Sequence, residues 1–319
     1  MPFTLLVPTN LPLPLEVPDG VVVVPYAVDA PIPAEHAHAD ALVVWANPAA
    51  QLADCAARLT RLRWVQTLAA GPDAVLGAGF APDVVITSGR SLHDGPVAEH
   101  TLALVLAAAR RLHLLVRAQD AHRWAGELGG VQPARPSDSF RTLAGARVLV
   151  WGFGSIAQEL APHLALLGAE VTGVARSADE RGGFPVIATD DLDAALPQAD
   201  LLITILPGTP ENYRAVSAER LALLPRHAWV VNVGRGSTLD EAALVAALRA
   251  GRLGGAALDV FETEPLPADS ALWDEPNVIV SPHAAGGRPV GAPALIEANL
   301  AALQAGRPLR NVVRAPSAP

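Results

Sequence analysis

Residues 147–160 read RVLVWGFGSIAQEL, and this stretch decides the fold. The apolar run RVLVW has the pattern of a buried strand, and SIAQEL has that of a helix. The turn between them has the spacing G-x-G-x-x-A, with Gly152, Gly154 and Ala157 at the small positions. The first glycine allows the tight turn, the second lets a phosphate approach the backbone, and the small third residue lets helix and strand pack closely. The pattern predicts dinucleotide binding, with the pyrophosphate on the first helical amides, those of Ser155 and Ile156.

Short apolar runs alternate with helical stretches along the chain. In the first part they cover residues 4–9, 21–27, 41–46, 63–69 and 83–89, and in the second part residues 147–153, 170–176, 201–206, 229–234, 256–261 and 278–283. Fully apolar strands separated by helices are typical of parallel sheets that are covered on both faces. We therefore expect an α/β protein with two doubly wound parallel-sheet domains.

Two helical patterns indicate how these domains are divided. The stretch 97–124 predicts one long helix that opens the second domain, and the stretch 292–306 predicts a helix that returns to the first. We expect a Rossmann cofactor domain over residues 97–287, inserted into a flavodoxin-like substrate-binding domain formed by residues 1–96 and 288–319.

The composition excludes several functions. A net charge of −9, with 51% hydrophobic and 17% charged residues, is typical of a globular protein and argues against a surface for nucleic acid or anionic membranes. All 23 basic residues are arginines, which excludes a Schiff-base lysine and the lysine of phosphate-binding loops. The histidines show no metal-ligand spacing with cysteine or acidic residues, so we expect no metal.

Cys55 is the single cysteine, so an intrachain disulfide is impossible and a reducing cytoplasm is the simplest location. It lies in a helix-like stretch, where we expect a buried, inert thiol rather than a nucleophile. Residues 1–18 are apolar, but they lack a basic region and are interrupted by prolines. We therefore expect neither a signal peptide nor a membrane span.

The end of the strand predicted over residues 170–176 decides the choice of cofactor. An acidic side chain there binds the ribose hydroxyls of NAD, whereas an arginine accommodates the 2′-phosphate of NADP. This chain has Arg176 and Ser177 at that point, with Arg181 further on, and no acidic residue at the strand end. A guanidinium and a hydroxyl suit a phosphate dianion, so we expect NADP. NAD is the alternative if Arg176 is simply a solvated strand-end arginine.

Three further residues each follow an apolar strand. Arg235 comes after AWVVNVG (228–234), Glu264 after GAALDVF (255–261), and His283 after NVIVSP (277–282). A cation, a carboxylate and an imidazole are the groups that reduction of a 2-oxo acid requires. The cation holds the substrate carboxylate, the imidazole supplies the proton, and the carboxylate orients the imidazole. Singly they would be a solvated arginine, a surface glutamate and a helix-capping histidine, so the argument depends on their joint occurrence.

The segment from Val97 to Gly286 closely resembles the D-isomer-specific 2-hydroxyacid dehydrogenases. The resemblance depends on the glycine motif and on five further strings: PVAEHTLAL (96–104), LPGTPEN (206–212), VNVGRGSTLDEAALVAAL (231–248), GGAALDVFETEPL (254–266) and SPHAAG (281–286). The first domain matches more loosely, through its strand order and TLAAGPDAV (67–75). The resemblance implies an NAD(P)-dependent oxidoreductase acting on the CH–OH group of 2-hydroxy acids.

The resemblance also implies roles for individual residues. Arg235 would pair with the substrate carboxylate and polarise the 2-oxo group. His283 would be the acid/base, with Glu264 on its other ring nitrogen. A Glu rather than a Gln at this position argues against the formate dehydrogenase branch.

Four more residues receive roles in the same way. Asp259 would contact the nicotinamide carboxamide, and Pro207 would contact the cofactor. The backbone amides of Ala70 and Gly71 would hold the other end of the substrate carboxylate. Pro72, which follows them, has no N–H and offers that loop one donor fewer.

The family dimerises through its cofactor domain, so a homodimer is expected. Trp124 resembles a tryptophan near that dimer contact, although we expect it to pack within the chain. We expect His100 to be a helix-packing residue rather than a second catalyst.

The substrate is less well defined. The first domain has no clear basic cluster for a phosphate, so glyoxylate or hydroxypyruvate is the leading substrate, ahead of hydroxyphenylpyruvate. One alternative is a short phosphoglycerate dehydrogenase that lacks a regulatory domain. Another is a non-enzymatic, dinucleotide-sensing protein similar to the corepressors related to this family.

Overall fold

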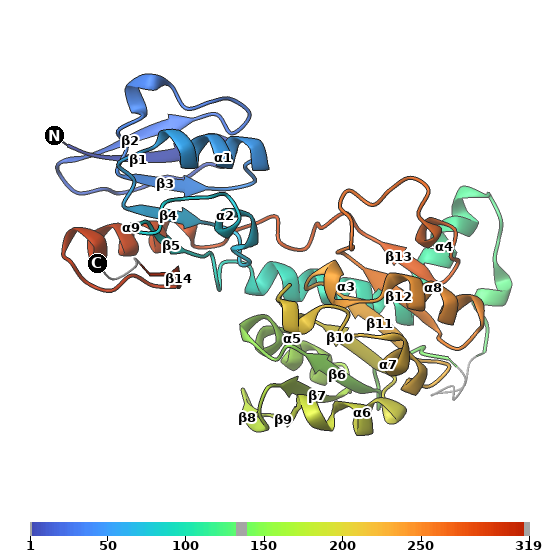
Figure 1. The fold of residues 1–319 in the computed structure, drawn as a ribbon. Coiled ribbons are helices and arrows are strands. Elements are labelled where there is room, and N and C mark those ends of the chain that lie inside the picture. The colour runs from blue at the N-terminus through green and yellow to red at the C-terminus, as the bar shows by residue number, and fades with distance from the viewer. Residues whose placement is uncertain (1, 132–138, 316–319) are drawn as a thin grey trace. The chain divides into compact units, whose positions relative to one another are not determined.

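The computed structural model describes residues 2–131 and 139–315, whose helices and strands are labelled in Figure 1. The chain forms two compact units, called here unit 1 (Met1–His93 with Arg288–Pro319) and unit 2 (Asp94–Gly287). Unit 2 is inserted into unit 1 in the sequence. The sequence placed the first division between residues 96 and 97, slightly further along the chain. The assignment of substrate to one unit and cofactor to the other remains a prediction.

The sheet of unit 1 has six strands in the order β14-β5-β4-β3-β1-β2. Their bounds are β1 Phe3–Pro8, β2 Val21–Tyr26, β3 Ala41–Val44, β4 Trp64–Thr67, β5 Val85–Thr87 and β14 Val312–Arg314. The first five are parallel to one another, in the order 2-1-3-4-5 that characterises flavodoxin-like sheets. The edge strand β14 is antiparallel to β5 and was not predicted from the sequence.

Three helices cover this sheet: α1 Ala49–Arg58, α2 Asp73–Leu76 and α9 Ala292–Gln304. Successive strand residues face opposite sides, so Leu6 belongs to the apolar cluster on the α1 side and Leu5 to the cluster around Ile296 of α9. Cys55 of α1 lies in the first cluster and is fully buried, as predicted. Burial, with a smaller contribution from the charge of Asp54, raises the pKa of the Cys55 thiol to about 11.

The sheet of unit 2 has eight strands in the order β13-β12-β11-β10-β6-β7-β9-β8. Their bounds are β6 Arg147–Trp151, β7 Glu170–Ala175, β8 Asp179–Arg181, β9 Phe184–Ala188, β10 Leu201–Thr204, β11 Trp229–Asn232, β12 Gly255–Leu258 and β13 Val278–Val280. Seven strands are parallel and β8 is antiparallel to β9. The order on either side of β6 is that of a Rossmann sheet, which confirms the predicted fold class.

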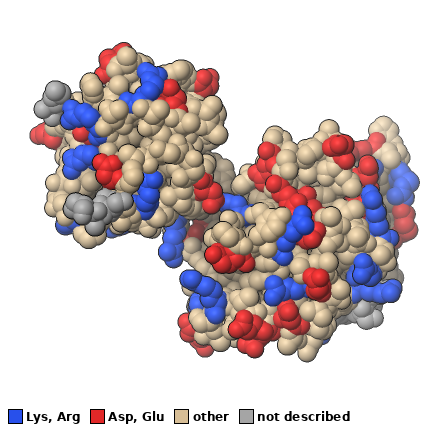
Figure 2. Space-filling model, in the orientation of Figure 1, with Lys and Arg blue, Asp and Glu red and all other residues tan. Residues whose placement is uncertain are grey.

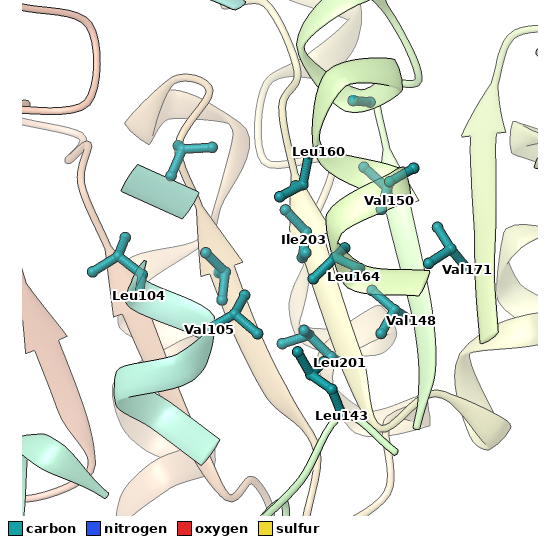
Figure 3. Close-up of a cluster of buried hydrophobic side chains, with 14 of the residues drawn as sticks. Leu104, Val105, Leu143, Val148, Val150, Leu160, Leu164, Val171, Leu201 and Ile203 are labelled. Atoms are coloured by element: carbon teal, nitrogen blue, oxygen red, sulfur yellow. The ribbon is translucent and has the colours of Figure 1, made fainter. Parts of the chain in front are cut away.

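Helices cover both faces of the unit 2 sheet. Their bounds are α3 Asp94–Ala109, α4 Leu112–Asp120, α5 Ser155–Leu166, α6 Leu192–Ala195, α7 Ala218–Leu223 and α8 Glu241–Arg249. In Figure 3, Leu160 and Leu164 of α5 lie over the valines and leucines of β6, β7 and β10. The second face is covered by α7 and α8, which contribute Leu221 and Leu244 to the other cluster. Both faces of the strands are therefore apolar, as the sequence predicted.

The long helix predicted over residues 97–124 is wrong in its length. The structure has α3 and α4 in its place, separated at Arg110–Arg111, where Arg111 has a φ of +55°. The helix α3 packs into the core along most of its length, whereas α4 buries only Ala118. The guanidinium of Arg111 donates to the carbonyl of Leu128, 2.7 Å away, and this bond stabilises the change of direction. Trp124 comes after α4 and is 96% exposed, so its predicted packing within the chain is also wrong.

Among the described residues, no helix is both long and apolar enough to cross a bilayer. On the face shown in Figure 2, acidic and basic side chains are intermingled on each unit.

Candidate active site

Three neighbouring parallel strands of unit 2 carry the predicted catalytic side chains in the loops after their carboxyl ends. Arg235 follows β11, Glu264 follows β12, and His283 follows β13. Because β11 pairs with β12 and β12 with β13, the three loops meet at one edge of the sheet. Ligands of open α/β sheets bind at the carboxyl ends of the strands, so this edge is where a site is expected.

His283 and Glu264 form a direct pair. The Nδ1 atom of His283 lies 2.7 Å from Oε2 of Glu264, and Oε1 of Glu264 accepts a hydrogen bond from the backbone N–H of Phe261 at 3.0 Å. The carboxylate therefore fixes the ring orientation and places a proton on Nδ1. The other ring nitrogen, Nε2, is then the atom that can exchange a proton with a ligand. The two side chains are 46% and 35% exposed, so a ligand can reach them.

The backbone of His283 has an unusual conformation, with a φ of +51°. For a residue with a Cβ this left-handed region is costly, and it persists only where the surroundings enforce it. Here the enforcing residue is Asp259. Its carbonyl accepts from the N–H of His283 at 2.8 Å, and its carboxylate accepts from the N–H groups of Ala284 and Ala285 at 2.9 and 3.0 Å.

Asp259 is thus the anchor of the loop that carries His283. Asp259 is only 1% exposed, and its Oδ1 also accepts a hydrogen bond from the hydroxyl of Ser281 at 2.6 Å. A buried carboxylate needs this many donors to offset the loss of water. The contact of Asp259 with the nicotinamide carboxamide stays a prediction, while the structure gives this residue a defined role in shaping the loop.

The loop of Arg235 is held in a similar way by buried polar side chains. Asn232, at the end of β11, is fully buried, donates to the carbonyl of Arg235 at 3.1 Å and accepts from the N–H of Gly234. The hydroxyl of Thr238 donates to the same Arg235 carbonyl at 2.7 Å. A Cβ on Gly236 would lie 1.8 Å from the carbonyl carbon of Phe261, so a glycine is required where the Arg235 and Glu264 loops touch. The partly exposed guanidinium donates to the carbonyl of Gly234 at 2.8 Å.

Arg214 connects several of these loops. Its N–H donates to the carbonyl of Ser237 at 2.8 Å, and its guanidinium lies 3.1 Å from Glu262 and 3.6 Å from Asp240. Arg214 itself has a φ of +48°. The paired carboxylates, Glu262 above all, raise the pKa of this guanidinium. Arg214 therefore links the loop before α7 to both the Arg235 loop and the Glu264 loop.

Glu241, at the start of α8, adds a further carboxylate to this edge. It accepts from the N–H of Glu262 at 2.6 Å. Burial raises the pKa of Glu241, and the charges of Glu262 and Glu264 add to that effect, whereas the hydrogen bond from Glu262 opposes it. At this edge Arg214 pairs with carboxylates, while the charges of Glu262 and Glu264 act against ionisation of Glu241.

The glycine turn has the geometry that the sequence predicted for it. Gly152 has a φ of +97°, and a Cβ there would lie 2.5 Å from the carbonyl oxygen of Ile205. Gly154 is different, because a Cβ on it would meet no heavy atom within 4 Å. Its missing side chain leaves space in front of the first turn of α5, where a pyrophosphate could approach the amides. Ala157, facing the sheet, is fully buried, and a larger side chain would not fit there.

The remaining predicted cofactor residues occupy different environments. Ser155 begins α5, and its hydroxyl donates to Asp94 at 3.0 Å, whereas Ile156 packs against the core with its side chain partly buried. Pro207 follows β10 on the same edge and is exposed, and its carbonyl accepts from Asn212 at 3.0 Å. Their contacts with a cofactor stay predictions.

The end of β7 presents the residues that were predicted to choose the cofactor. Arg176 and Ser177 directly follow the strand and are exposed. Arg181 lies on β8, and its guanidinium donates to the carbonyl of Phe153 at 3.2 Å. Because Phe153 stands between the two glycines of the turn, the hairpin β8–β9 brings a second arginine to the glycine turn.

In unit 1, Ala70 and Gly71 lie in the loop after β4, at the carboxyl edge of that sheet. The N–H of Gly89 donates to the carbonyl of Ala69 at 2.8 Å. A Cβ on Gly89 would lie 1.9 Å from the carbonyl oxygen of Leu68, so the loop after β5 can touch the loop after β4 only with a glycine there. Ala70 is exposed and Gly71 is partly exposed.

Two aromatic rings stand beside this loop of unit 1. His93 is buried, and its Nε2 lies 2.8 Å from the carbonyl of Leu68. Trp45, at the end of β3, stacks on the imidazole with ring centroids 5.5 Å apart. The loop is thus fixed from both sides by backbone contacts and ring packing.

An apolar hollow of about 440 Å³ adjoins the His283–Glu264 pair in unit 2. Besides that pair, its walls are Phe261, Pro265, Leu266, Trp273, Val280 and Pro282. Among the described residues, no group of three His, Cys, Asp or Glu side chains is placed to hold a metal ion.

Sequence reasoning missed several residues that shape the site. Asn232 and Ser281 each carry a polar side chain at the end of an apolar run, and a polar residue in such a run is a signal for a buried hydrogen bond. Arg214 and Glu241 gave no comparable signal, because exposed charges are common in loops and at helix starts. His100 is not simply a packing residue, since its Nε2 lies 3.0 Å from the hydroxyl of Ser281.

The chain is similar to known proteins over most of its length. Residues 102–285 match the model of the family described as D-isomer specific 2-hydroxyacid dehydrogenase, NAD binding domain. The chain is 33% identical over 290 residues to glyoxylate/hydroxypyruvate reductase A of Serratia proteamaculans, covering 88% of both chains. It is 34% identical over 250 residues to D-3-phosphoglycerate dehydrogenase of Mycobacterium leprae. This match covers 77% of this chain but only 45% of the Mycobacterium protein.

A solved structure is similar over nearly the whole chain. The D-isomer specific 2-hydroxyacid dehydrogenase of Xanthobacter autotrophicus Py2, in complex with NADPH and MES, superposes with a TM-score of 0.79 at 33% identity, covering 98% of each chain. The chain belongs to the D-isomer specific 2-hydroxyacid dehydrogenase family.

Proposed function

We propose that this protein is an NADP-dependent D-2-hydroxyacid dehydrogenase that reduces small 2-oxo acids, with glyoxylate or hydroxypyruvate as the leading substrates. One observation carries the proposal: the His283–Glu264 pair, at 2.7 Å, lies at the same sheet edge as Arg235. A fixed imidazole and a cation are the groups that carbonyl reduction of an anionic substrate needs from the protein.

In the proposed mechanism His283 is the acid. Glu264 occupies Nδ1, so Nε2 faces the substrate and donates its proton to the oxygen of the 2-oxo group during reduction. In oxidation the same nitrogen accepts the hydroxyl proton. Arg235 pairs with the substrate carboxylate and draws electron density from the adjacent carbonyl. The backbone amides of Ala70 and Gly71 remain the predicted donors to the other end of that carboxylate.

The glycine turn of unit 2 fits a dinucleotide, which supplies the hydride when it is bound. The open space at Gly154 lies in front of the first amides of α5. Arg176 and Ser177 are exposed at the end of β7, and Arg181 lies at the turn itself. Two guanidiniums and a hydroxyl suit a 2′-phosphate, which supports NADP over NAD. The NADPH held by the Xanthobacter relative supports the same choice.

Two observations bear on the substrate. The similarity to glyoxylate/hydroxypyruvate reductase A extends over 88% of both chains, which favours a small 2-oxo acid. The similarity to phosphoglycerate dehydrogenase has nearly the same identity but includes less than half of that protein, so 3-phosphoglycerate is the second candidate. The apolar hollow beside His283 has room for a side chain, which justifies testing an aromatic 2-oxo acid as well.

We also propose that the protein is a homodimer. Exposed apolar side chains gather on and after α4, including Leu115, Val116 and Trp124. Several of these residues line a groove of about 1130 Å³. Exposed apolar surface of this kind favours association. Light scattering of the purified protein checks the mass, and a monomeric mass at all concentrations would contradict the proposal.

The test of the function is consumption of NADPH, with NADH in parallel, against glyoxylate, hydroxypyruvate, pyruvate, hydroxyphenylpyruvate and phosphohydroxypyruvate. We expect turnover of glyoxylate or hydroxypyruvate, with kcat/KM for NADPH at least about tenfold above that for NADH, the ratio that one charge-assisted hydrogen bond supplies. Absence of turnover with every acid, although NADPH binds, would contradict the proposed reaction. Turnover of phosphohydroxypyruvate alone would favour the second candidate.

A further inference from the structure

His100 has a position that the proposed mechanism does not use. It lies on α3, and its Nε2 is 3.0 Å from Oγ of Ser281 and 3.2 Å from Oδ1 of Asp259. Its side chain is 26% exposed, whereas that of Asp259 is 1% exposed. The helix α3 precedes the glycine turn in the chain, and Ser281 and Asp259 follow β13 and β12. Three elements distant in sequence therefore meet at one buried carboxylate.

The hydrogen-bond donors in this group can be assigned. The hydroxyl of Ser281 lies 2.6 Å from Oδ1 of Asp259 and donates to it, because an ionised carboxylate can only accept. The oxygen of Ser281 is then an acceptor toward His100. The Nε2 atom of His100 must accordingly carry a proton, which it shares between Ser281 and Asp259. His100 is a donor in this network.

The same carboxylate determines the backbone beside His283. Its oxygens accept from the N–H groups of Ala284 and Ala285, and the carbonyl of Asp259 accepts from the N–H of His283. His283 has a φ of +51°, a conformation that reverts unless its surroundings enforce it. A change in the position of Asp259 would therefore weaken these hydrogen bonds and let the imidazole of His283 move.

We propose that His100 is a positioning residue: through Ser281 and Asp259 it holds the loop of His283 in its strained conformation. The inference rests on the proposed function, because its consequence is the orientation of the acid/base. It assigns a role to a histidine outside the Arg235, Glu264 and His283 set. It also explains why a partly buried histidine stands on α3, whose buried residues are mostly apolar.

The test compares His100→Leu, which removes the donor, with His100→Gln, whose amide nitrogen can take the place of Nε2. We expect kcat to fall about tenfold in H100L, since a small misplacement of a catalytic group can cost up to about a hundredfold. In H100Q we expect recovery to within about threefold of the wild type, the smaller loss expected when a donor is kept. The dissociation constant for NADPH and the thermal midpoint stay close to wild type. His163→Leu, an exposed histidine on α5, is the matched control and keeps its kcat.

A double variant separates a shared network from independent effects. If His100 acts through Ser281, the kcat of H100L/S281A is no lower than that of the more impaired single variant, because one network is broken twice. Losses that multiply would overturn the proposal, as would a wild-type kcat in H100L.

A readout without turnover keeps this inference distinct from the proposed function. Hydrogen exchange of the amides of Ala284 and Ala285 reports the bonds to Asp259 directly. We expect faster exchange of both amides in H100L but not in H100Q or H163L. Unchanged exchange would overturn the positioning role, even if the wild type reduced no acid. Faster exchange in a protein without turnover would support the role and contradict only the proposed reaction.

Discussion

At the carboxyl edge of the sheet in unit 2, the groups suited to chemistry are side chains, whereas at the carboxyl edge in unit 1 the loops present mainly backbone and aromatic rings. In unit 2, Arg235, Glu264 and His283 project from three adjacent loops whose backbones are held by buried Asn232 and Asp259. In unit 1, the loop after β4 is fixed by the close approach of Gly89 and by the ring of His93.

This difference changes what a substitution can do. Where a side chain performs the chemistry, its removal takes away function and leaves the fold. Where backbone amides are the predicted functional groups, as in unit 1, no side chain can be deleted, and the informative change is the addition of a Cβ that displaces the loop. The following experiments use this contrast, from the largest expected effect to the smallest.

The largest effect is expected for His283→Ala. A positioned general acid contributes about 10²–10⁴-fold, so we expect kcat to fall by that range. His283 is not part of the glycine turn, and the affinity for NADPH, measured by fluorescence titration, stays within about twofold, inside the scatter expected for sites without shared partners. A loss of NADPH binding in step with activity would show that the imidazole is not simply the acid.

The second effect tests the glycine turn of unit 2, where the proposed function depends on the absence of a side chain. Gly154→Val places its side chain in open space, so we expect a normal thermal midpoint but NADPH affinity reduced at least about tenfold, a loss of roughly 1.4 kcal/mol. Gly152→Ala meets the carbonyl of Ile205 and a left-handed backbone, so it should instead lower the thermal midpoint. If G154V bound NADPH normally, the pyrophosphate would lie elsewhere.

The contrast between the edges also explains what could be predicted from the sequence. The apolar runs predict the main parallel strands of both sheets, because strands buried on both faces are continuously apolar, and they predict that Arg235, Glu264 and His283 follow neighbouring strands. The strands β8, β9 and β14 were not predicted. The break between α3 and α4 was missed, because no proline or glycine stands at Arg110–Arg111 to indicate it. The break depends on how each helix packs, since α3 is buried in the core along most of its length and α4 buries only Ala118. The anchoring by Asp259, Ser281 and His100 was missed as well, because it joins residues brought together only by the fold.

In unit 1 the corresponding experiment is Gly89→Ala. The new Cβ would meet the carbonyl of Leu68 at 1.9 Å, so either the loop after β4 or the loop after β5 must move. We expect a loss of about 1–3 kcal/mol in stability, typical of overpacking, measured by urea unfolding. Gly77→Ala is the control in the same unit, because its Cβ would make only an ordinary contact of 3.5 Å. Equal midpoints for the two variants would mean that this edge yields easily and is not defined by its backbone.

The smallest effect is a loss of folding stability, which arises where charged side chains lie close together at the edge of the sheet. Burial and the neighbouring carboxylates raise the pKa of Glu241 above its usual 4.5, so the ionised form weakens the folded state at pH values above the raised pKa. Glu241→Gln keeps an oxygen that can accept from the N–H of Glu262 and removes the charge. We expect its thermal midpoint to exceed that of the wild type at pH 7 by the order of 1 °C, as for a partly exposed charge.

This advantage of the Gln variant should shrink as the pH falls through the raised pKa and vanish below about 4.5, where Glu241 is protonated in both the folded and the unfolded chain. Glu219→Gln at the start of α7 is the control of opposite sign. The hydrogen bond of the Ser217 side chain, and after it that of its own backbone N–H, lower the pKa of Glu219, so its charge favours folding at pH 7 and that contribution disappears in acid. Two variants that shifted in the same direction at pH 7 would show that helix position, and not the crowding of carboxylates beside Glu264, decides the sign.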